Sequence, residues 1–307
     1  MTRLIVDTDT AGDDVFSLLI ALRHPGVTLE AITVCCGNVG FDQEVENALY
    51  TVEQAGRAGE VPVYAGCREP LVSEWVGAEY VHGRDGMGDS FFPPARQRPE
   101  AEHAVDELVR RIDESPGELT ILAQAPLTNL AVAFTRDPSI VRRVAHLYVM
   151  GGGVGNITPA AEYNFYVDPE AAKIVLNAGF PLTLFTWSLT RTHGVFDDAK
   201  LARIAALDTP LSDFFGRVNR KAREFDDAVN HLGGSTHPDS MVCAAIVEPS
   251  LVLAKEEAVV DVETSGDLTR GWNLIDTLGR VDREPNATVV TDYDTEGFFE
   301  LMLSILG

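Results

Sequence analysis

Short apolar runs alternate with segments of helical periodicity along most of the chain. By this alternation we expect strands at 3–8, 29–37, 118–124, 144–150 and 180–187. We expect helices at 13–23, 42–56, 126–136, 168–179 and 241–249. Apolar runs of strand length between amphipathic helices are typical of repeated strand–helix–strand units. The pattern predicts an α/β fold with an open, mostly parallel sheet and helices on both faces.

No change in composition, fixed-period repeat or low-complexity tract divides the 307 residues of the chain. A chain of this length with 45% hydrophobic residues can bury one large core. We therefore predict a single domain over residues 1–307. Three long segments interrupt the strand–helix alternation, and such loops usually bind ligands or cover a site. They are 66–100, 151–167 and 231–240.

The chain is strongly acidic, with 47 Asp and Glu against 24 Lys and Arg and a formal net charge of −23. Binding of a nucleic acid polymer depends on clustered Lys and Arg, so this composition excludes such a partner. An acidic surface would suit a salt-rich cytosol, where ions screen self-repulsion, and we keep this as a hypothesis. No membrane-spanning run and no secretory leader is recognisable, which predicts a cytoplasmic protein without membrane association.

Four aspartates crowd the turn between the first expected strand and helix, in "LIVDTDTAGDDVFSLLIAL". They are Asp7, Asp9, Asp13 and Asp14. Ligands of open parallel sheets bind beyond the carboxyl ends of the strands, which is where this turn lies. Carboxylates this close repel one another unless a cation lies among them. A hard divalent ion such as Ca²⁺ or Mg²⁺ prefers oxygen ligands of this kind.

Two other interpretations of the turn remain open on these residues alone. Asp13 and Asp14 stand where helix caps stand, although a cap needs one aspartate and the turn has four. An apolar strand followed by D-x-D-x-T is also typical of magnesium-dependent aspartyl-phosphate phosphatases, in which the first Asp attacks phosphorus. Asp7 would be that nucleophile, but Ala11 stands where the pattern has Thr or Val.

Further motifs along the chain resemble one family in order and over nearly the whole length. The calcium-dependent nucleoside hydrolases, known as the inosine–uridine preferring family, are similar in "DTDTAGDD", "CGN" ending at Asn38, "VPVYAG", "HG" at His82, "APLTNLA", "MGGGVGNITPAAEYNFYVDPEAA" and "HPDS". The resemblance implies an enzyme that hydrolyses the N-glycosidic bond of ribonucleosides to ribose and free base. It also implies a homodimer or homotetramer.

The resemblance implies a Ca²⁺ site as well. Its ligands would be Asp9, Asp14, Asp239 and the backbone carbonyl of Gln124. Asp9 would also be the general base that takes a proton from the metal-bound water. We expect Ca²⁺ as the cofactor and a small ribonucleoside as the partner.

The remaining matches imply a sugar and base site. Asp13, Asn38 and Asp239 would contact ribose, and Asn156, Glu162 and Asn164 would hold its 3′ and 5′ side. His82 would line the base side, where Trp187 and Phe225 are candidates for stacking on the base. Each of these residues has a simpler interpretation as a turn, cap or core residue, and only their order in one chain favours the site.

The chain departs from the family pattern where many members carry the His that protonates the leaving base. Pro238 occupies that position, and His237 precedes it. We interpret His237 as a surface residue rather than an acid. The departure leaves the base preference open and makes a non-catalytic ribose or nucleoside binder the alternative from another class.

Overall fold

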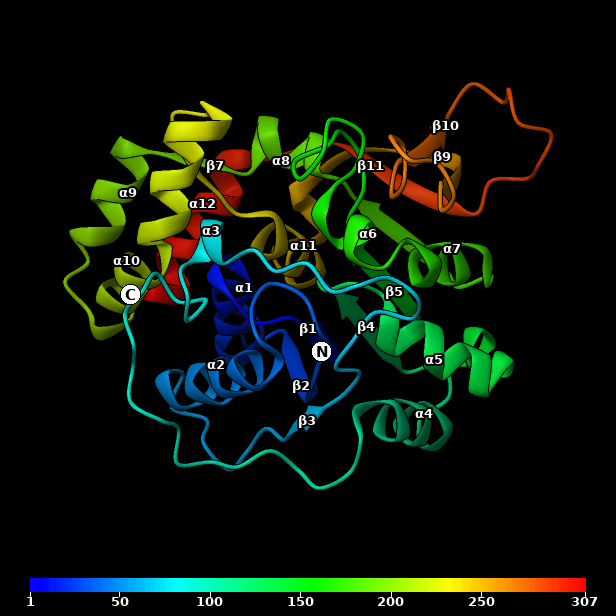
Figure 1. Cartoon of the computed structure of the whole chain (residues 1–307). Coiled ribbons are helices and arrows are strands. Elements are labelled where there is room, and N and C mark those ends of the chain that lie inside the picture. The colour runs from blue at the N-terminus through cyan, green and yellow to red at the C-terminus, as the bar shows by residue number, and fades with distance from the viewer.

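The computed structural model describes residues 1–307 and contains a nine-stranded sheet with the order β10-β9-β11-β6-β5-β4-β1-β2-β3 (Figure 1). Its strands are β1 (Thr2–Thr8), β2 (Val27–Val34), β3 (Val63–Ala65), β4 (Leu119–Ala123), β5 (His146–Met150), β6 (Leu182–Phe185), β9 (Val252–Val262), β10 (Asn273–Asp276) and β11 (Ala287–Tyr293). A separate antiparallel pair is formed by β7 (Val195–Asp197) and β8 (Gly234–Thr236).

Twelve α-helices accompany the sheet. They are α1 (Gly12–Arg23), α2 (Phe41–Gln54), α3 (Glu79–His82), α4 (Ala104–Glu114), α5 (Thr128–Arg136), α6 (Tyr163–Val167), α7 (Pro169–Asn177), α8 (Trp187–His193), α9 (Asp198–Ala205), α10 (Pro210–Phe225), α11 (Pro238–Val247) and α12 (Thr295–Leu306). None of them combines the length and apolar character needed to cross a lipid bilayer.

The mostly parallel sheet predicted from the sequence is confirmed. Every pairing from β11 to β3 is parallel, and β9 runs antiparallel to both of its neighbours. All five expected strands and all five expected helices are present. The hairpin of β9 and β10, which extends the sheet at one edge, lies in a part of the chain for which the sequence predicted no elements.

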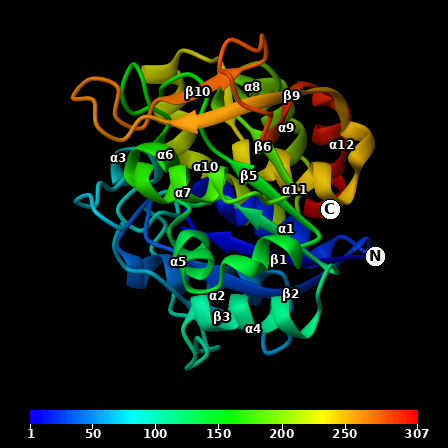
Figure 2. The ribbon, with the colours of Figure 1, turned by 90° about the vertical axis from the view of Figure 1, so that its right-hand side faces the viewer.

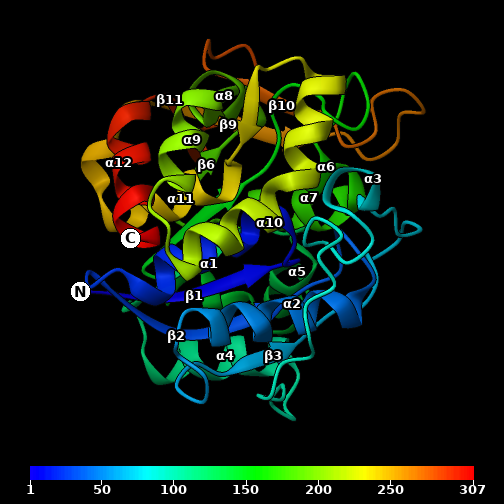
Figure 3. The ribbon, with the colours of Figure 1, turned by 90° about the vertical axis from the view of Figure 1, so that its left-hand side faces the viewer.

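Helices cover both faces of the sheet, as predicted. Adjacent residues of β1 point to opposite faces, so that Leu4 and Val6 join one apolar core and Ile5 joins another. Figure 2 shows α4, α5 and α7 over the second core. Figure 3 shows the opposite face, where α1, α2 and α10 lie over the first core. Because both faces are buried, the central strands are continuously apolar until they reach the site.

Two expected boundaries were wrong. Trp187 does not end a strand but begins α8, because the side chain of Thr186 accepts the Leu189 N–H and caps a new helix. The irregular segment 151–167 ends in α6, whose first amides donate to the side chain of Glu162. In both places a single capping side chain determines the local structure.

Candidate active site

A cavity of about 790 Å³, including its open mouth, lies beyond the carboxyl ends of the parallel strands. Such volumes are typical of small-molecule sites. Almost all of the predicted site residues line it, namely Asp13, Asp14, Asn38, His82, Gln124, Asn156, Glu162, Asn164, Trp187, Phe225 and Asp239. Asp9 is fully buried and does not contribute to the cavity wall. The fold therefore brings together residues from 13 to 239 that the sequence grouped only by resemblance.

The turn into α1 positions Asp14. Gly12 has a positive φ of 40° and donates its N–H to the carbonyl of Gly86. The Asp14 carboxylate accepts the N–H of Ala11 at 3.2 Å and the hydroxyl of Thr8 at 2.7 Å. Gln124 adds an Nε2–H bond at 3.0 Å. Asp14 therefore closes the first turn of the helix and is held rigidly at the cavity.

Asp9 is held by the loop that follows β2. Its Oδ2 accepts the backbone N–H of Asn38 at 3.0 Å, and the Asn38 side chain donates to the carbonyl of Asp9 and to Asp14. A Cβ atom on Gly37 would lie 1.8 Å from that Oδ2, so only glycine fits there. Oδ1 of Asp9 has no hydrogen-bond partner although it is buried.

Glu44 of α2 was missed by the sequence analysis, and its side chain bonds the loop 37–39 that follows β2. Its Oε1 accepts the N–H groups of Gly37 and Val39, each at 3.0 Å, and the residue is fully buried. Glu44 lies three residues after Phe41 and four before Ala48, on the face of the helix that these apolar residues bury. A carboxylate at such a position could have been recognised in the sequence as buried.

Burial and mutual repulsion raise the carboxyl pKa values of the cluster. Burial, followed by the charges of Asp14, Glu44 and Asp239, raises the pKa of Asp9 well above its ordinary value. The pKa of Asp239 is also raised well above its ordinary value, by burial and then by the charge of Asp14. Burial raises the pKa of Asp14 to about 6, against several hydrogen bonds that lower it. A cation among these three carboxylates would reduce their repulsion and lower their pKa values, as in other metal sites.

The structure contains no group of three or more His, Cys, Asp or Glu side chains arranged to hold a metal ion. Both oxygens of Asp14 are engaged in hydrogen bonds within the protein. The backbone carbonyl of Gln124 accepts the Asn164 Nδ2–H at 3.4 Å. The predicted ligands thus share one region, but they do not form a closed ligand shell in this conformation.

Asp13 was predicted to contact ribose, and the structure shows its carboxylate occupied by the start of α11. Its Oδ2 accepts the N–H groups of Asp239 and Ser240, at 2.6 and 3.0 Å. Its Oδ1 accepts the Ser240 hydroxyl at 2.6 Å and lies 3.1 Å from Nδ1 of His237. Asp13 therefore holds Asp239 in place, and its contact with ribose stays a prediction.

The interpretation of His237 as a surface residue was wrong. The ring is fully buried, with its Nε2 2.9 Å from the Ser235 hydroxyl and its centroid 4.4 Å from that of Phe196. The imidazole can be buried there because each of its nitrogens has a hydrogen-bond partner, Ser235 for Nε2 and Asp13 for Nδ1. Pro238, which follows it, lines the cavity but has no proton to donate.

The loop after β5 carries the predicted sugar contacts. Glu162 accepts the N–H groups of Gly152 and Asn164 at 2.8 and 2.9 Å, and burial raises its pKa to about 7. The Asn164 side chain donates to the carbonyl of Met150 at 3.3 Å. Oδ1 of Asn156 is buried at the cavity without any partner. The loop therefore presents an unpaired amide oxygen beside a well-anchored carboxyl group.

Aromatic residues line another part of the cavity. Trp187 and Phe225 are both present, as predicted, and the ring of Tyr80 meets Phe225 edge-on at 5.5 Å between centroids. Sequence reasoning missed Tyr80, although it stands two residues before His82 in a long loop. Burial lowers the pKa of His82 to about 4, so its imidazole is neutral at pH 7, and Nδ1 has no partner.

Asp7 lies outside the cavity. It is fully buried, and its Oδ1 accepts the Thr33 hydroxyl at 2.6 Å and the Asn129 Nδ2–H at 2.8 Å. Asp9 is equally buried, but it bonds Asn38, which lines the cavity, whereas Thr33 and Asn129, the partners of Asp7, do not line it. A nucleophile must reach its substrate, so this placement argues against attack of Asp7 on phosphorus. Asn129, in the first turn of α5, is therefore a structural partner of Asp7.

Asp7→Asn should change how stability depends on pH. Burial raises the folded-state pKa of Asp7 from 3.8 to about 6, so its ionisation costs stability as the pH rises through that range. Asparagine keeps the oxygen that accepts both hydrogen bonds and cannot ionise. Urea unfolding should show the variant gaining about 1 kcal/mol on the wild type between pH 5 and pH 7. A constant difference across that range would contradict the assignment.

The family model of inosine-uridine preferring nucleoside hydrolases matches residues 4–300. The pyrimidine-specific ribonucleoside hydrolase RihA of Shewanella woodyi is 34% identical over 316 aligned positions, covering 100% of this chain and 98% of that protein. RihA of Citrobacter koseri is 33% identical, covering 97% of this chain and 96% of that protein.

Solved structures agree with the sequence match. The plant nucleoside hydrolase PpNRh1 superposes with a TM-score of 0.94 at 29% identity, covering 99% of this chain and 98% of that one. A purine-preferring ribonucleoside hydrolase from Gardnerella vaginalis has a TM-score of 0.91 at 27% identity, with coverages of 99% and 98%. The chain therefore belongs to the inosine-uridine preferring nucleoside hydrolase family and is an N-ribohydrolase.

Proposed function

We propose that the chain hydrolyses ribonucleosides with Asp9 as general base and with Ca²⁺ bound beside it. The observation that carries this proposal is the buried, unpartnered Oδ1 of Asp9 within a group of carboxyls that raise one another's pKa. A buried carboxylate oxygen without a partner is costly unless a proton or cation meets it. Such an arrangement is typical of a functional site rather than of a structural one.

The residues present suit a hard cation. Carboxylates of Asp9, Asp14 and Asp239 and the carbonyl of Gln124 are all oxygen ligands, which is the donor set that Ca²⁺ prefers. Asp239 has no side-chain hydrogen bond within the protein, so its carboxylate is free to bind. Rotation of these side chains would be needed to complete the shell. When bound, Ca²⁺ would lower the pKa of a coordinated water and orient it.

The other residues would stabilise the transition state. Breaking an N-glycosidic bond places positive charge on the ribose, and carboxylate or amide oxygens around the ring stabilise that charge where it develops. Asn38, Asn156, Glu162 and Asn164 are the candidates for these contacts. The side chains of Asn38, Glu162 and Asn164 are held by hydrogen bonds to the backbone, whereas Oδ1 of Asn156 is unpaired. Asp9 would accept the proton of the attacking water through its free oxygen.

The leaving base would be held by the aromatic part of the cavity. Trp187, Tyr80 and Phe225 offer ring faces and edges for stacking. His82 is neutral at pH 7 and lines the same cavity, so its ring is a further candidate for contact with the base. Since Pro238 has no proton to give, we infer that these four residues bind and activate the base in place of a histidine at that position.

Ribose release from inosine, guanosine, adenosine, cytidine, uridine and nicotinamide riboside tests this proposal and determines the preferred base. We expect reducing sugar from at least one nucleoside, and no phosphate release from a phosphomonoester. Calcium-dependent binding of a nucleoside without turnover would instead establish the non-catalytic binder. The phosphomonoester is the control for the phosphatase alternative.

Two further expectations stay predictions. The resemblance implies a homodimer or homotetramer, and multi-angle light scattering of the purified chain would measure its molar mass in solution. The cytoplasmic location would be measured by fractionation of cells that express it.

A further inference from the structure

Residues 270–273, from the C-terminal part of the chain, lie against the loop 151–162 that carries Asn156. Oδ1 of Asn273, the first residue of β10, accepts the N–H of Gly153 at 3.2 Å. Trp272 forms an isolated antiparallel bridge with Ala161. The segment therefore touches the loop near its beginning and again near its end.

Glycine is needed at two close contacts of this segment, one with the loop and one with α6. A Cβ atom on Gly152 would lie 2.4 Å from Oδ1 of Asn273. Gly271 has a φ of 78°, and a Cβ atom there would lie 2.8 Å from the Cα of Tyr166. Gly152 thus packs directly on the Asn273 side chain and Gly271 on the backbone of α6, so a shift of the segment moves the chain it contacts.

The segment 270–273 also contacts α6, the helix that follows the loop. Arg270 donates from Nη1 to the carbonyl of Tyr166 at 3.0 Å, and its guanidinium carbon lies 5.1 Å from the centre of the Tyr166 ring. Tyr166 belongs to α6, in which Asn164 lies two residues earlier. Residues 270–273 thus contact the chain on both sides of Asn156 and Glu162.

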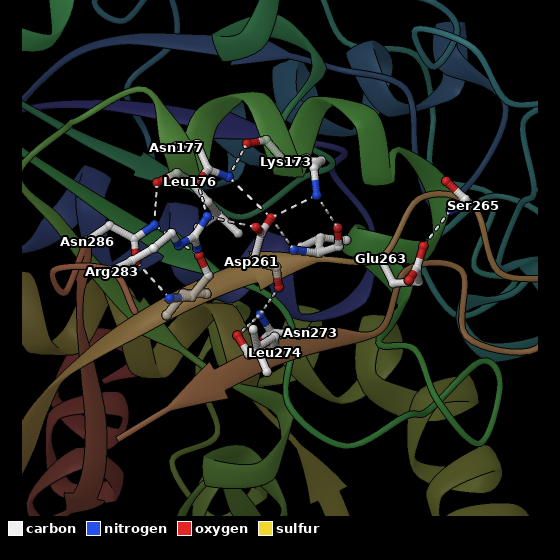
Figure 4. A network of polar contacts seen from close by, with 12 residues as sticks. Lys173, Leu176, Asn177, Asp261, Glu263, Ser265, Asn273, Leu274, Arg283 and Asn286 are labelled. Carbon is white, nitrogen blue, oxygen red and sulfur yellow. Dashed lines mark hydrogen bonds and ion pairs between the residues drawn. The ribbon is translucent and has the colours of Figure 1, made fainter. Parts of the chain in front are cut away.

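The hairpin that supplies this segment is itself anchored, as Figure 4 shows. Asn273 donates from Nδ2 to the carbonyl of Asp261 in β9 at 3.2 Å. The Asp261 carboxylate accepts from Lys173 and Arg283, each at 3.1 Å, and from Asn177 at 3.2 Å. Lys173 and Asn177 belong to α7, so the hairpin is fixed to the main body of the fold.

We propose that the β9–β10 hairpin is a brace for the loop 151–162 and that Asn273 is a positioning residue for the sugar side of the site. Its buried side chain links Gly153 to β9 and thereby holds Asn156 and Glu162 at the cavity. The effect on ribose rests on the proposed function, whereas the brace itself is a property of the free protein. The two parts are therefore measured separately.

Hydrogen exchange of the ligand-free protein tests the brace. Asn273→Ala should speed amide exchange in peptides covering 151–162 by about fivefold to tenfold, because one hydrogen bond to the loop is lost. Asn273→Asp keeps the oxygen that accepts the Gly153 N–H but loses the Nδ2–H bond to the Asp261 carbonyl, so its exchange rate should lie between those of the wild type and Asn273→Ala. Asn286→Ala is the matched control, since Asn286 also bonds β9, at Val260, but does not bond the loop. Unchanged exchange in Asn273→Ala would overturn the proposal.

Kinetics with a 5′-deoxynucleoside test the positioning role. The wild type should prefer the parent nucleoside, and Asn273→Ala should lower that preference in kcat/KM about tenfold, because the 5′ side is no longer held in place. A purely structural defect would lower kcat/KM for both substrates equally and would overturn the positioning role. If the wild type released no ribose at all, the proposed function would fail, while the exchange experiment would still decide the brace.

Discussion

Asp9→Asn is expected to lower kcat for ribose release by about a thousandfold or more, with little change in the fold. Asparagine has nearly the same shape and its oxygen can still accept the Asn38 N–H, which lies 3.0 Å from the native carboxylate. It cannot take a proton from water, and general base catalysis is typically worth about a hundredfold to ten-thousandfold. Loss of an anionic ligand of the proposed Ca²⁺ would add to the effect. The measurement is single-turnover and steady-state ribose release at pH 7.5.

Two measurements would distinguish a loss of catalysis in Asp9→Asn from a loss of its folded structure. Removing one charge from the repelling cluster should leave the melting temperature of metal-free protein unchanged or higher. Asp7→Asn is the matched control, because Asp7 is equally buried and lies two residues before Asp9, but its partners Thr33 and Asn129 do not line the cavity. Activity of Asp9→Asn within tenfold of the wild type would refute the role of Asp9 as base.

Removal of divalent cations is expected to abolish ribose release and to lower thermal stability. A cation that binds only the folded state stabilises it by about 2.7 kcal/mol at a hundredfold excess over its dissociation constant. The repulsion that raises the pKa values of Asp9 and Asp239 should reappear when the ion is stripped. Activity and melting temperature with a chelator, and after stepwise return of Ca²⁺ or Mg²⁺, would measure this.

Asp239→Asn provides the internal check on the metal. This variant should need a higher Ca²⁺ concentration for half-maximal stabilisation, because one of the proposed anionic ligands becomes neutral. Full activity in the presence of a chelator would contradict the calcium proposal and leave Asp9 to activate water without help. Restoration by Mg²⁺ but not by Ca²⁺ would assign a different ion to the same residues.

The sequence was sufficient for most of the fold and for the family, and nearly all the residues that it proposed for the site line one cavity. Alternating apolar strands and amphipathic helices predicted a parallel sheet, since burial on both faces requires that pattern. The acidic turn at Asp9 and the loop around Asn156 carried the family resemblance. Both are local signals, in which the residues that matter are neighbours along the chain.

The tertiary structure decided how distant residues act on that site. Asp13 meets Asp239, 226 residues away, because α1 and α11 pack against each other, and the same packing buries His237. Glu44 supports Asn38 from a helix that looks amphipathic in sequence, and Asn273 reaches Gly153 from a hairpin that the sequence pattern did not reveal. Hydrophobic periodicity specifies which face of an element is buried, whereas partners across the fold depend on strand order and helix packing. That is why the acidic turn could be recognised from the sequence alone, whereas the residues that support it from other elements could not.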